Sequence, residues 1–226
     1  MHVCGYNRTA SIVVVAASVL AVACSSSAPS QPGTPAPSSA RSSLAPSLPA
    51  PVGLIVPHNT TAYLLLDLTS IVCTPRPSCV ATLPAAAALL KKARDSKAFV
   101  LYTDTPTAGS QIRAEVAPQA DEVKVTAHAD KFFGTQLDEI LKQHGVKTLV
   151  LAGTSVNGAV LYTAFEANLR GYTVVVAEDA VSSDDPYVVQ LSLFQLLNQP
   201  GFTNPQNKPL LPNSVTLSRT DLITFQ

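Results

Sequence analysis

The sequence contains no tryptophan, a single methionine and few charged side chains, which make up 13% of its 226 residues. The 15 Lys and Arg residues equal the 15 Asp and Glu residues in number, so the chain has no net positive charge. A protein that binds a nucleic-acid backbone needs a surplus of basic side chains. A nucleic-acid partner is therefore not expected.

A long hydrophobic run is also missing. The most sustained apolar stretch, residues 12–24, is interrupted by Ser18 and is shorter than the roughly 20 residues that a transmembrane helix requires. Because the mean hydropathy is +0.24, the apolar residues must be spread along the chain instead. They suffice for the core of one domain of ordinary size.

Residues 1–23 have the pattern of an export signal. Arg8 supplies the positive charge, residues 12–22 form the apolar segment, and small residues follow as a cleavage site. Because Cys24 comes directly after this site, the segment resembles a bacterial lipoprotein signal, in which the cysteine is lipidated, although Ala21 stands where leucine is more usual. An ordinary secretory signal is the alternative. Both predict an extracytoplasmic protein, and the first anchors it to the cell membrane through Cys24.

The next segment, residues 24–56, is expected to be a disordered tether. Residues 25–51 contain nine Ser and seven Pro with a single charge, at Arg41. A segment of this composition buries almost no apolar surface and stays extended. The folded domain is therefore expected at residues 57–226, held away from a membrane surface by the tether. A low-complexity leader without a role predicts the same lack of structure.

Few cysteines remain for the domain itself. Cys4 and Cys24 belong to the signal, and Cys73 and Cys79 lie close together in a proline-containing segment. A CxxC redox pair or a zinc site needs tighter spacing and further ligands. In an oxidising compartment this pair favours a structural disulfide, and two free thiols are the alternative.

From residue 57 onward, apolar runs of strand length alternate with amphipathic stretches of helix length. Thr82 is expected to cap the first helix, with Pro84 in its first turn. Because the strands are continuously apolar, both of their faces should be buried, which predicts a three-layer α/β/α sandwich around a mainly parallel sheet of six strands. The expected strands are 63–66, 98–103, 122–127, 147–152, 172–177 and 214–217, and the expected helices are 82–97, 135–144, 157–170 and 187–197.

In such a sheet, functional groups belong at the carboxyl ends of the strands, near the point where the strand order reverses. Asp67 follows the first expected strand, Asp104 the second, and the turn 153–158 the fourth. This turn lacks the second glycine of GxGxxG and the Gly-Lys-Ser/Thr of a phosphate loop. Ser155 is not expected to be a nucleophile, because no histidine follows His144 to complete a Ser-Asp-His triad.

Three parts of the chain resemble the isochorismatase-like, or cysteine hydrolase, superfamily. They are the strand 63–66 with Asp67, the segment 131–141 beginning at Lys131, and the stretch 149–164 followed by 171–180. Their order and spacing are similar to those of the family across most of the domain. The resemblance implies a Rossmann-like sheet with an Asp, a Lys and a Cys at its strand-order reversal, and Asp67 and Lys131 match the first two.

The resemblance places Ala159 where the family's amidases have their catalytic cysteine. A methyl group cannot attack a carbonyl, so the covalent route is excluded at this position. In the family's true isochorismatases, which have glycine there, an Asp promotes hydrolysis of a vinyl ether by water. The resemblance therefore implies general acid catalysis by Asp67, with a raised pKa and with Lys131 setting its charge. We expect Asp67 and Lys131 in hydrogen-bonding contact, with Ala159 on the opposite wall.

No cofactor is expected, and no metal either. The family's Asp-x-His metal ligands would fall on Asp104 and Pro106, and a single carboxylate without histidine partners is a poor transition-metal site. The substrate or ligand is expected to be a small molecule. Groups expected to contact it, besides the three at the family's catalytic positions, are Asp104, Thr154, Ser155, Asn157 and Gly158.

Two functions remain open at this point. One is noncovalent hydrolysis of a small molecule outside the cytoplasm, and the other is binding of a small ligand or a protein partner without catalysis. Retention of both Asp67 and Lys131 favours a functioning pocket, but a buried pair is also hard to lose one partner at a time. A homo-oligomer is compatible with the sequence, which does not determine the oligomeric state.

Overall fold

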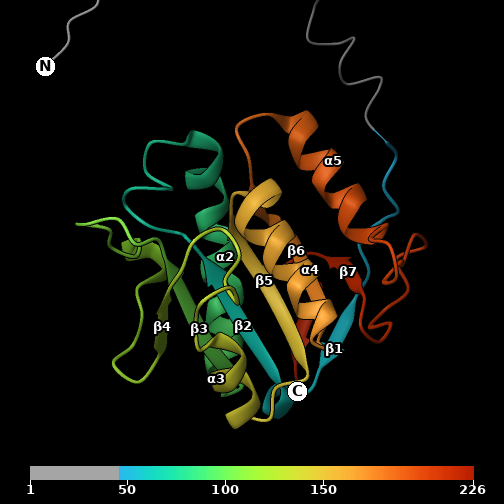
Figure 1. Cartoon of the computed structure of the whole chain (residues 1–226), viewed down its shortest axis with the longest axis horizontal. Coiled ribbons are helices and arrows are strands. Elements are labelled where there is room, and N and C mark those ends of the chain that lie inside the picture. The colour runs from blue at the N-terminus through green and yellow to red at the C-terminus, as the bar shows by residue number, and fades with distance from the viewer. Residues whose placement is uncertain (1–45) are drawn as a thin grey trace, which may run out of the picture. The chain divides into compact units, whose positions relative to one another are not determined.

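The computed structural model describes residues 46–226, which contain a six-stranded, fully parallel sheet (Figure 1). Its strand order is β4-β3-β2-β5-β6-β7. The strands are β2 (Thr61–Leu66), β3 (Phe99–Asp104), β4 (Val123–Thr126), β5 (Thr148–Thr154), β6 (Thr173–Ser182) and β7 (Val215–Ser218). The expected six-stranded parallel sheet is confirmed.

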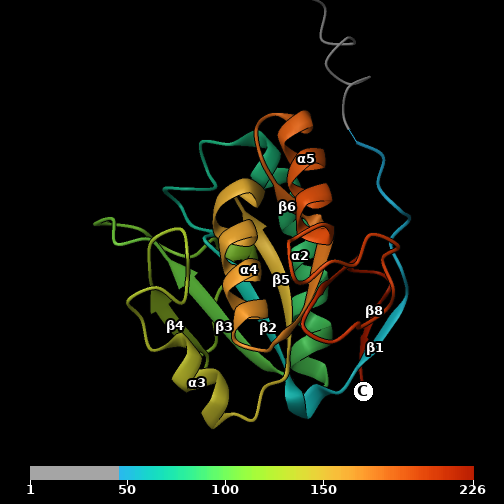
Figure 2. The same ribbon diagram turned by 45° about the vertical axis from the view of Figure 1, so that its right-hand side comes forward.

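Helices cover both faces of this sheet, which gives the expected three layers (Figures 1 and 2). One face carries α3 (Leu137–Gln143), α4 (Leu161–Leu169) and α5 (Pro186–Leu197), and the other carries α2 (Pro77–Asp95). The chain also forms two short 3-10 turns, η1 (His58–Thr60) and η2 (Ala114–Val116). Side chains alternate along β2, so Leu64 and Leu66 join the core under the three helices. Tyr63 and Leu65 join the core under α2.

The strand order reverses between β2 and β5. From β2 the chain proceeds outward to β3 and β4, and from β5 it proceeds in the other direction to β6 and β7. The carboxyl ends of β2 and β5 therefore border the crevice in which α/β sheets bind their ligands. Gly153 allows the two strands to approach closely here, since its φ is +138° and a Cβ at this position would lie 2.1 Å from the Leu66 carbonyl oxygen.

A second, two-stranded sheet joins distant parts of the chain. β1 (Leu54–Val56) pairs in parallel with β8 (Ile223–Phe225), and both strands pack against the α2 side of the domain. This corrects the expected domain boundary at residue 57, because β1 belongs to the fold and not to the tether. A three-residue strand carries too short an apolar pattern to be recognised without its partner.

The N-terminal expectations fall mostly outside the described residues. These are the export signal 1–23, the lipidation of Cys24 and the tether up to residue 45. From its start at Pro46 the described chain contacts α5, because the Pro46 carbonyl oxygen accepts a hydrogen bond of 2.7 Å from Gln190 Nε2. Within residues 46–226, no helix combines the length and the apolar character that a bilayer crossing requires.

α2 begins at Pro77, earlier than the expected start at Thr82. Pro77 suits the first helical turn, where its missing backbone donor is not needed. Thr82 consequently lies inside the helix, where its hydroxyl donates to the Cys79 carbonyl oxygen at 2.8 Å and caps nothing. Pro84 is an interior residue of this helix rather than a first-turn residue. Either Pro77 or Pro84 could stand in the first turn of a helix. The helix starts at Pro77, so the prediction from Pro84 was wrong.

Candidate active site

Asp67 comes directly after β2, at the crevice formed by the strand-order reversal. Its φ of 54° turns the chain sharply, and its side chain is almost completely buried. The Asp67 backbone N–H donates to Thr103 Oγ1 at 3.2 Å, and the same hydroxyl donates to Asp67 Oδ1 at 2.9 Å. Thr103, the residue paired with Leu66 across β2 and β3, therefore fixes both the backbone and the carboxylate of Asp67.

Lys131 holds the other oxygen of this carboxylate. Its Nζ donates to Asp67 Oδ2 at 2.6 Å and to the His128 carbonyl oxygen at 2.6 Å, and its side chain is fully buried. The Lys131 backbone N–H donates to Thr163 Oγ1 on α4 at 3.3 Å. The expected hydrogen-bonding contact between Asp67 and Lys131 is present.

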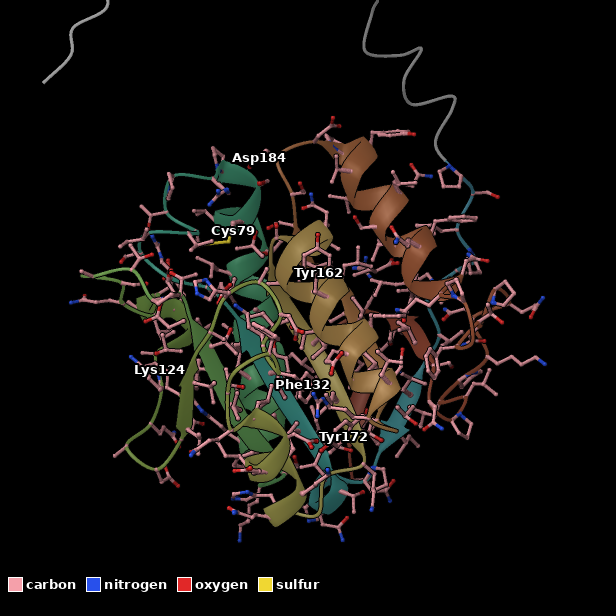
Figure 3. The ribbon with its side chains drawn as sticks, viewed as in Figure 1. Cys79, Lys124, Phe132, Tyr162, Tyr172 and Asp184 are labelled. Atoms are coloured by element: carbon pink, nitrogen blue, oxygen red, sulfur yellow. A yellow bond between two sulfur atoms is a disulfide. The ribbon has the colours of Figure 1, made fainter. Side chains whose placement is uncertain are left out.

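The residue after Lys131 anchors this segment to the three-helix face. Phe132 is buried and stacks on Tyr172, with the ring centroids 6.0 Å apart (Figure 3). The Arg170 guanidinium also lies over the Phe132 ring, with its Cζ 5.1 Å from the ring centroid. Packing of Phe132 thus sets the position from which Lys131 reaches Asp67.

Burial raises the pKa of the Asp67 carboxyl group above its ordinary value. The Lys131 ammonium and the hydrogen bonds from Lys131 and Thr103 act in the opposite direction but do not cancel this effect, and the nearby Asp104 carboxylate adds to it. Asp67 therefore keeps its proton at a higher pH than an exposed aspartate does. This is the property that a general acid requires.

A cavity of about 520 Å³ opens beside the Asp67–Lys131 pair. A volume of this size is typical of small-molecule sites. Asp67 and Ala159 both line the cavity, together with Thr154, Ser155 and His128. Asp67 and Ala159 therefore line the same cavity.

Ala159 lies in a π-helical turn, η3 (Val156–Val160), that precedes α4. The Val160 backbone N–H donates to the Ser155 carbonyl oxygen at 3.2 Å, which is the i to i+5 spacing of a π-helix. The Thr154–Ser155 peptide bond just before it is cis. π-Turns of this kind are frequent at functional sites, and this one brings Ala159 to the cavity wall.

Three of the five expected ligand contacts line this cavity and two do not. Thr154, Ser155 and Gly158 are on its wall. Asn157 is exposed and absent from the wall, because neighbouring residues of a helical turn point in different directions.

Asp104 is the second expected residue that does not line the cavity. It is buried at the end of β3, where Oδ1 accepts a hydrogen bond of 2.5 Å from Ser110 Oγ and Oδ2 lies 3.7 Å from Lys124 Nζ. Its influence on the site is electrostatic, through the pKa of Asp67. Across residues 46–226, no three His, Cys, Asp or Glu side chains form a group that could hold a metal ion.

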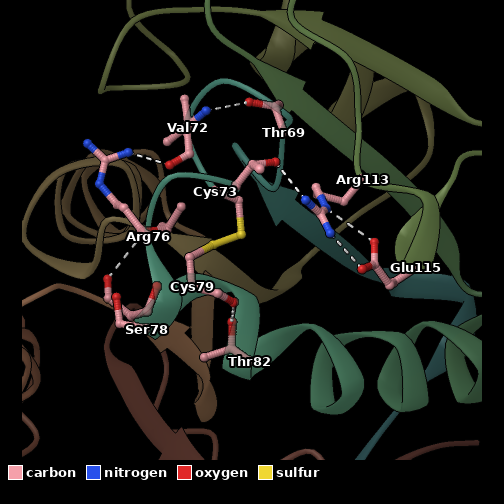
Figure 4. The surroundings of a disulfide bond; sticks show 12 residues. Thr69, Val72, Cys73, Arg76, Ser78, Cys79, Thr82, Arg113 and Glu115 are labelled. Atoms are coloured by element: carbon pink, nitrogen blue, oxygen red, sulfur yellow. Dashed lines mark hydrogen bonds and ion pairs between the residues drawn. A yellow bond between two sulfur atoms is a disulfide. The ribbon is translucent and has the colours of Figure 1, made fainter.

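The expected disulfide between Cys73 and Cys79 is present, and both cysteines are buried (Figure 4). It closes the loop next to Val72, which lines the cavity beside Asp67. The Arg76 guanidinium donates to the Val72 carbonyl oxygen and lies 3.5 Å from Asp184. Because these two cysteines are the only ones in the described part of the chain, no free thiol lines the cavity.

The sheet, the buried Asp–Lys pair at its strand-order reversal and the cavity of small-molecule size together define a doubly wound α/β domain with a candidate small-molecule site. The comparison with known families specifies the class further. The isochorismatase domain model matches residues 61–203. The chain belongs to the isochorismatase family.

Two curated relatives show how far the similarity extends. The secreted isochorismatase effector Isc1 of Verticillium dahliae is 34% identical over 117 residues, which cover 46% of this chain and 62% of the effector. The maleamate amidohydrolase of Pseudomonas putida is 29% identical over 163 residues, which cover 58% of this chain and 76% of that enzyme. The match thus spans less than two thirds of the effector's length.

Solved structures share the fold over most of their length. The cysteine hydrolase from Pseudomonas syringae pv. phaseolicola aligns with a TM-score of 0.65 at 19% identity, covering 76% of this chain and 94% of that one. The N-carbamoylsarcosine amidase from Thermoplasma acidophilum aligns with a TM-score of 0.57 at 25% identity, covering 72% and 97%. The domain therefore has the isochorismatase-like α/β fold.

Proposed function

We propose that this protein is an isochorismatase-family hydrolase that cleaves a small molecule without a covalent enzyme intermediate. The supporting observation is that the buried Asp67–Lys131 pair faces a cavity in which Ala159 occupies the position that the family resemblance assigns to the nucleophilic cysteine. The cysteines of the described residues are joined in a disulfide. Within residues 46–226, a thioester intermediate therefore has no free thiol from which to form.

In this proposal Asp67 is the general acid. Its protonated carboxyl group transfers a proton to the substrate, and water adds to the electrophilic carbon that results. The proton released from the added water returns to the Asp67 carboxylate, which restores the starting state. For a vinyl ether, the proton goes to the terminal carbon, and the hemiketal formed by water addition breaks down to an alcohol and a carbonyl compound. The raised pKa of Asp67 supports this role.

Lys131 and Thr103 position the acid. Lys131 Nζ contacts Oδ2 and Thr103 Oγ1 contacts Oδ1, so the carboxyl group cannot rotate freely. When Asp67 has lost its proton, the ammonium at 2.6 Å stabilises the carboxylate that remains. A hydroxyl can donate or accept, so Thr103 can hydrogen-bond to Asp67 in both charge states.

We also infer that the protein acts outside the cytoplasm. The export signal expected at residues 1–23 and the Cys73–Cys79 disulfide support this location, because structural disulfides persist in oxidising compartments. The Verticillium relative is described as secreted. A lipid attached to Cys24 would anchor the protein at the outer face of the cell membrane.

A domain that binds a ligand without catalysis is the second candidate. This candidate is favoured because the Asp67–Lys131 pair forms its hydrogen bonds within the protein. The fully buried Lys131 donates from its ammonium to Asp67 and to the His128 carbonyl oxygen. Such a pair can persist for structural reasons, since loss of one partner leaves the other buried without compensation. The cavity would then serve recognition alone.

Asp67→Asn separates the two candidates. The amide keeps the shape of the carboxyl group but cannot transfer its proton. We would incubate the protein with maleamate, N-carbamoylsarcosine and isochorismate, follow cleavage by mass spectrometry and measure binding by calorimetry. A hydrolase should lose at least about 100-fold in turnover of any cleaved compound while its binding stays nearly unchanged.

The control is Asp95→Asn, which removes a carboxylate from the exposed Lys91–Asp95 pair on α2, away from the cavity beside Asp67. This variant should keep wild-type turnover. A compound that the wild-type protein binds in the cavity but never cleaves would support the binding function. Full turnover by the Asp67→Asn variant would contradict the proposed acid.

A further inference from the structure

The outer sides of α4 and α5 carry a cluster of exposed apolar side chains. The two helices lie side by side in the layer that covers one face of the sheet (Figures 1 and 2). Ten large apolar side chains are exposed among the described residues, and five of them lie on these helices, which are nine and twelve residues long. They are Tyr162, Phe165 and Leu169 on α4 and Leu191 and Phe194 on α5. Single exposed apolar residues are normal, but a cluster marks a contact surface.

These five residues form a second apolar face on helices that already have one. On each helix they follow one another at intervals of three or four, so they project from the same side. The opposite side of each helix packs in the core, through residues such as Ala164 and Leu193. We call the surface formed by the five exposed residues the α4–α5 face.

The two helices contain almost no charge. α5 has no charged residue among its twelve, and α4 has one, Glu166. A helix that is apolar on all sides is normally buried. The centre of a protein interface is likewise depleted in charge and enriched in Tyr and Phe. The composition of α4 and α5 is therefore that of helices covered by protein.

A groove lies between the two helices within this face. Its volume is about 270 Å³, and its walls include Tyr162 and Phe165 from α4 and Gln195 from α5. Phe194, the neighbour of Gln195 along α5, is exposed. The face thus combines an apolar recess with an exposed aromatic ring, and an aromatic side chain in a pocket is the contact that dominates binding at many interfaces.

The exposed area fits a second copy of the chain. Together the five side chains expose roughly 450 Å², taking about 200 Å² for a whole side chain of this size. Each partner of a stable interface contributes about 800 Å². The apolar residues alone supply more than half of this area, and the polar residues around them, such as Gln195 and Asn198, add to it.

The charges beside the face favour a second copy over a membrane surface. Helices that lie on membranes carry Lys and Arg on their polar side, and neither α4 nor α5 contains either residue. Glu166 on α4 and Arg170, which follows the helix, form a pair of opposite sign at 2.6 Å. Across a two-fold axis, this acid and base can face the base and the acid of an identical surface.

We propose that the α4–α5 face is the interface of a two-fold symmetric homodimer. Phe194 of each copy enters the groove between α4 and α5 of the other copy, so the same contact forms twice. Removal of the five apolar side chains from water stabilises the dimer. This inference does not depend on the proposed hydrolysis, because the groove shares no lining residue with the cavity beside Asp67.

Sedimentation velocity of the protein between about 0.1 and 100 μM tests the proposal, because interfaces of this size have Kd values in the micromolar range or below. We expect a species with twice the mass of one chain. Phe194→Asp places a charge in the apolar interface and should weaken the dimer at least about 100-fold. Tyr162→Glu changes a half-exposed side chain on the other helix and should have the same effect.

Ile55→Asp is the matched control. Ile55 is an apolar residue of β1 that is 63% exposed and lies outside the α4–α5 face, so an acidic residue there should leave the association unchanged. Thermal unfolding verifies that each variant is folded. A wild-type protein that is monomeric at the highest concentration, or a dimer that persists in both Phe194→Asp and Tyr162→Glu, would overturn the proposal.

A flotation assay with vesicles of phosphatidylcholine and phosphatidylglycerol tests the membrane alternative. We expect the wild-type protein and Phe194→Asp to behave alike in this assay, because the α4–α5 face is covered by the second copy. Vesicle binding by a monomeric wild-type protein that Phe194→Asp abolishes would identify the face as a membrane surface, and the homodimer would then be wrong.

Discussion

The Asp67 carboxylate lies 2.6 Å from the Lys131 ammonium, and both side chains are withdrawn from water at the end of β2. The same distance, 2.6 Å, separates Lys91 from Asp95 on the surface of α2, where both side chains are exposed. Water screens the second pair but not the first. The two ion pairs have the same length but differ in exposure. Comparing variants of the two pairs therefore shows how much burial contributes to their stability.

Lys131→Met should lower the free energy of unfolding by about 3–5 kcal/mol at neutral pH, because it leaves the Asp67 carboxyl group buried without its partner. Lys91→Met, at the exposed pair, should lower it by less than about 1 kcal/mol. Asp67→Asn combined with Lys131→Met should cost less than the sum of the two single changes, since no unpaired buried charge remains. Urea unfolding measures all four variants. Strictly additive costs at the buried pair would show that the two groups are not coupled.

Thr103→Val should raise the pKa of Asp67 further, because the Thr103 hydrogen bond favours the ionised carboxylate. The protonated form is the active one in the proposed reaction, so the rate falls as the pH rises through this pKa. The falling limb of the kcat/KM profile should consequently move to higher pH in Thr103→Val. Thr103→Ser keeps the hydroxyl and should keep the wild-type limb. NMR titration of the Asp67 carboxyl carbon gives the same information without a substrate, and identical titrations in both variants would contradict the prediction.

Thiol reagents test the assignment of Ala159. Iodoacetamide should leave any activity of the wild-type protein unchanged, because its described cysteines form a disulfide. Ala159→Cys should introduce a thiol whose alkylation rate falls when Asp67→Asn is added, since the carboxylate can act as its base. Asn157→Cys, in the same turn but exposed, should react at a rate independent of Asp67. An unreactive thiol at position 159 would mean that this position does not face the cavity.

Replacement of both Cys73 and Cys79 by Ser should lower the free energy of unfolding by about 2 kcal/mol, because the disulfide closes only a short loop. The loop also carries Val72 to the cavity wall, so ligand binding beside Asp67 should weaken together with stability. Urea unfolding and calorimetry of the double variant measure the two effects. Full binding in the double variant would show that the loop keeps its position without the disulfide.

The strand ends next to the site could be predicted because their signal is local. β2 is a continuous run of buried residues that ends at Asp67, and β3 is one that ends at Asp104. A continuous apolar run that is followed by an acidic residue can be recognised in the sequence itself. The position of the Asp67 side chain relative to Lys131 came from the family resemblance, because no local pattern connects residues this far apart.

Other features depend on contacts that a single segment does not contain. Thr103 could have been inferred from the register of β2 and β3, since it pairs with Leu66, the residue before Asp67. Asp104 lies at a strand end, where a ligand contact was expected, but its carboxylate contacts Ser110 and Lys124 instead. The loop that carries Ser110 and the neighbouring strand that carries Lys124 determine this side-chain direction. Side-chain direction at a strand end is set by these partners rather than by position along the chain.

The parallel pairing of β1 with β8 determines when the domain can be completed. β1 leaves the ribosome early, but its partner, residues 223–225, is synthesised late. α2 depends on the same region, because Lys92 Nζ donates to the carbonyl oxygens of Thr220, Asp221 and Ile223. Contacts between residues so distant in sequence slow folding. The β1–β8 sheet and the Lys92 contacts can therefore form only after the last strand has been synthesised.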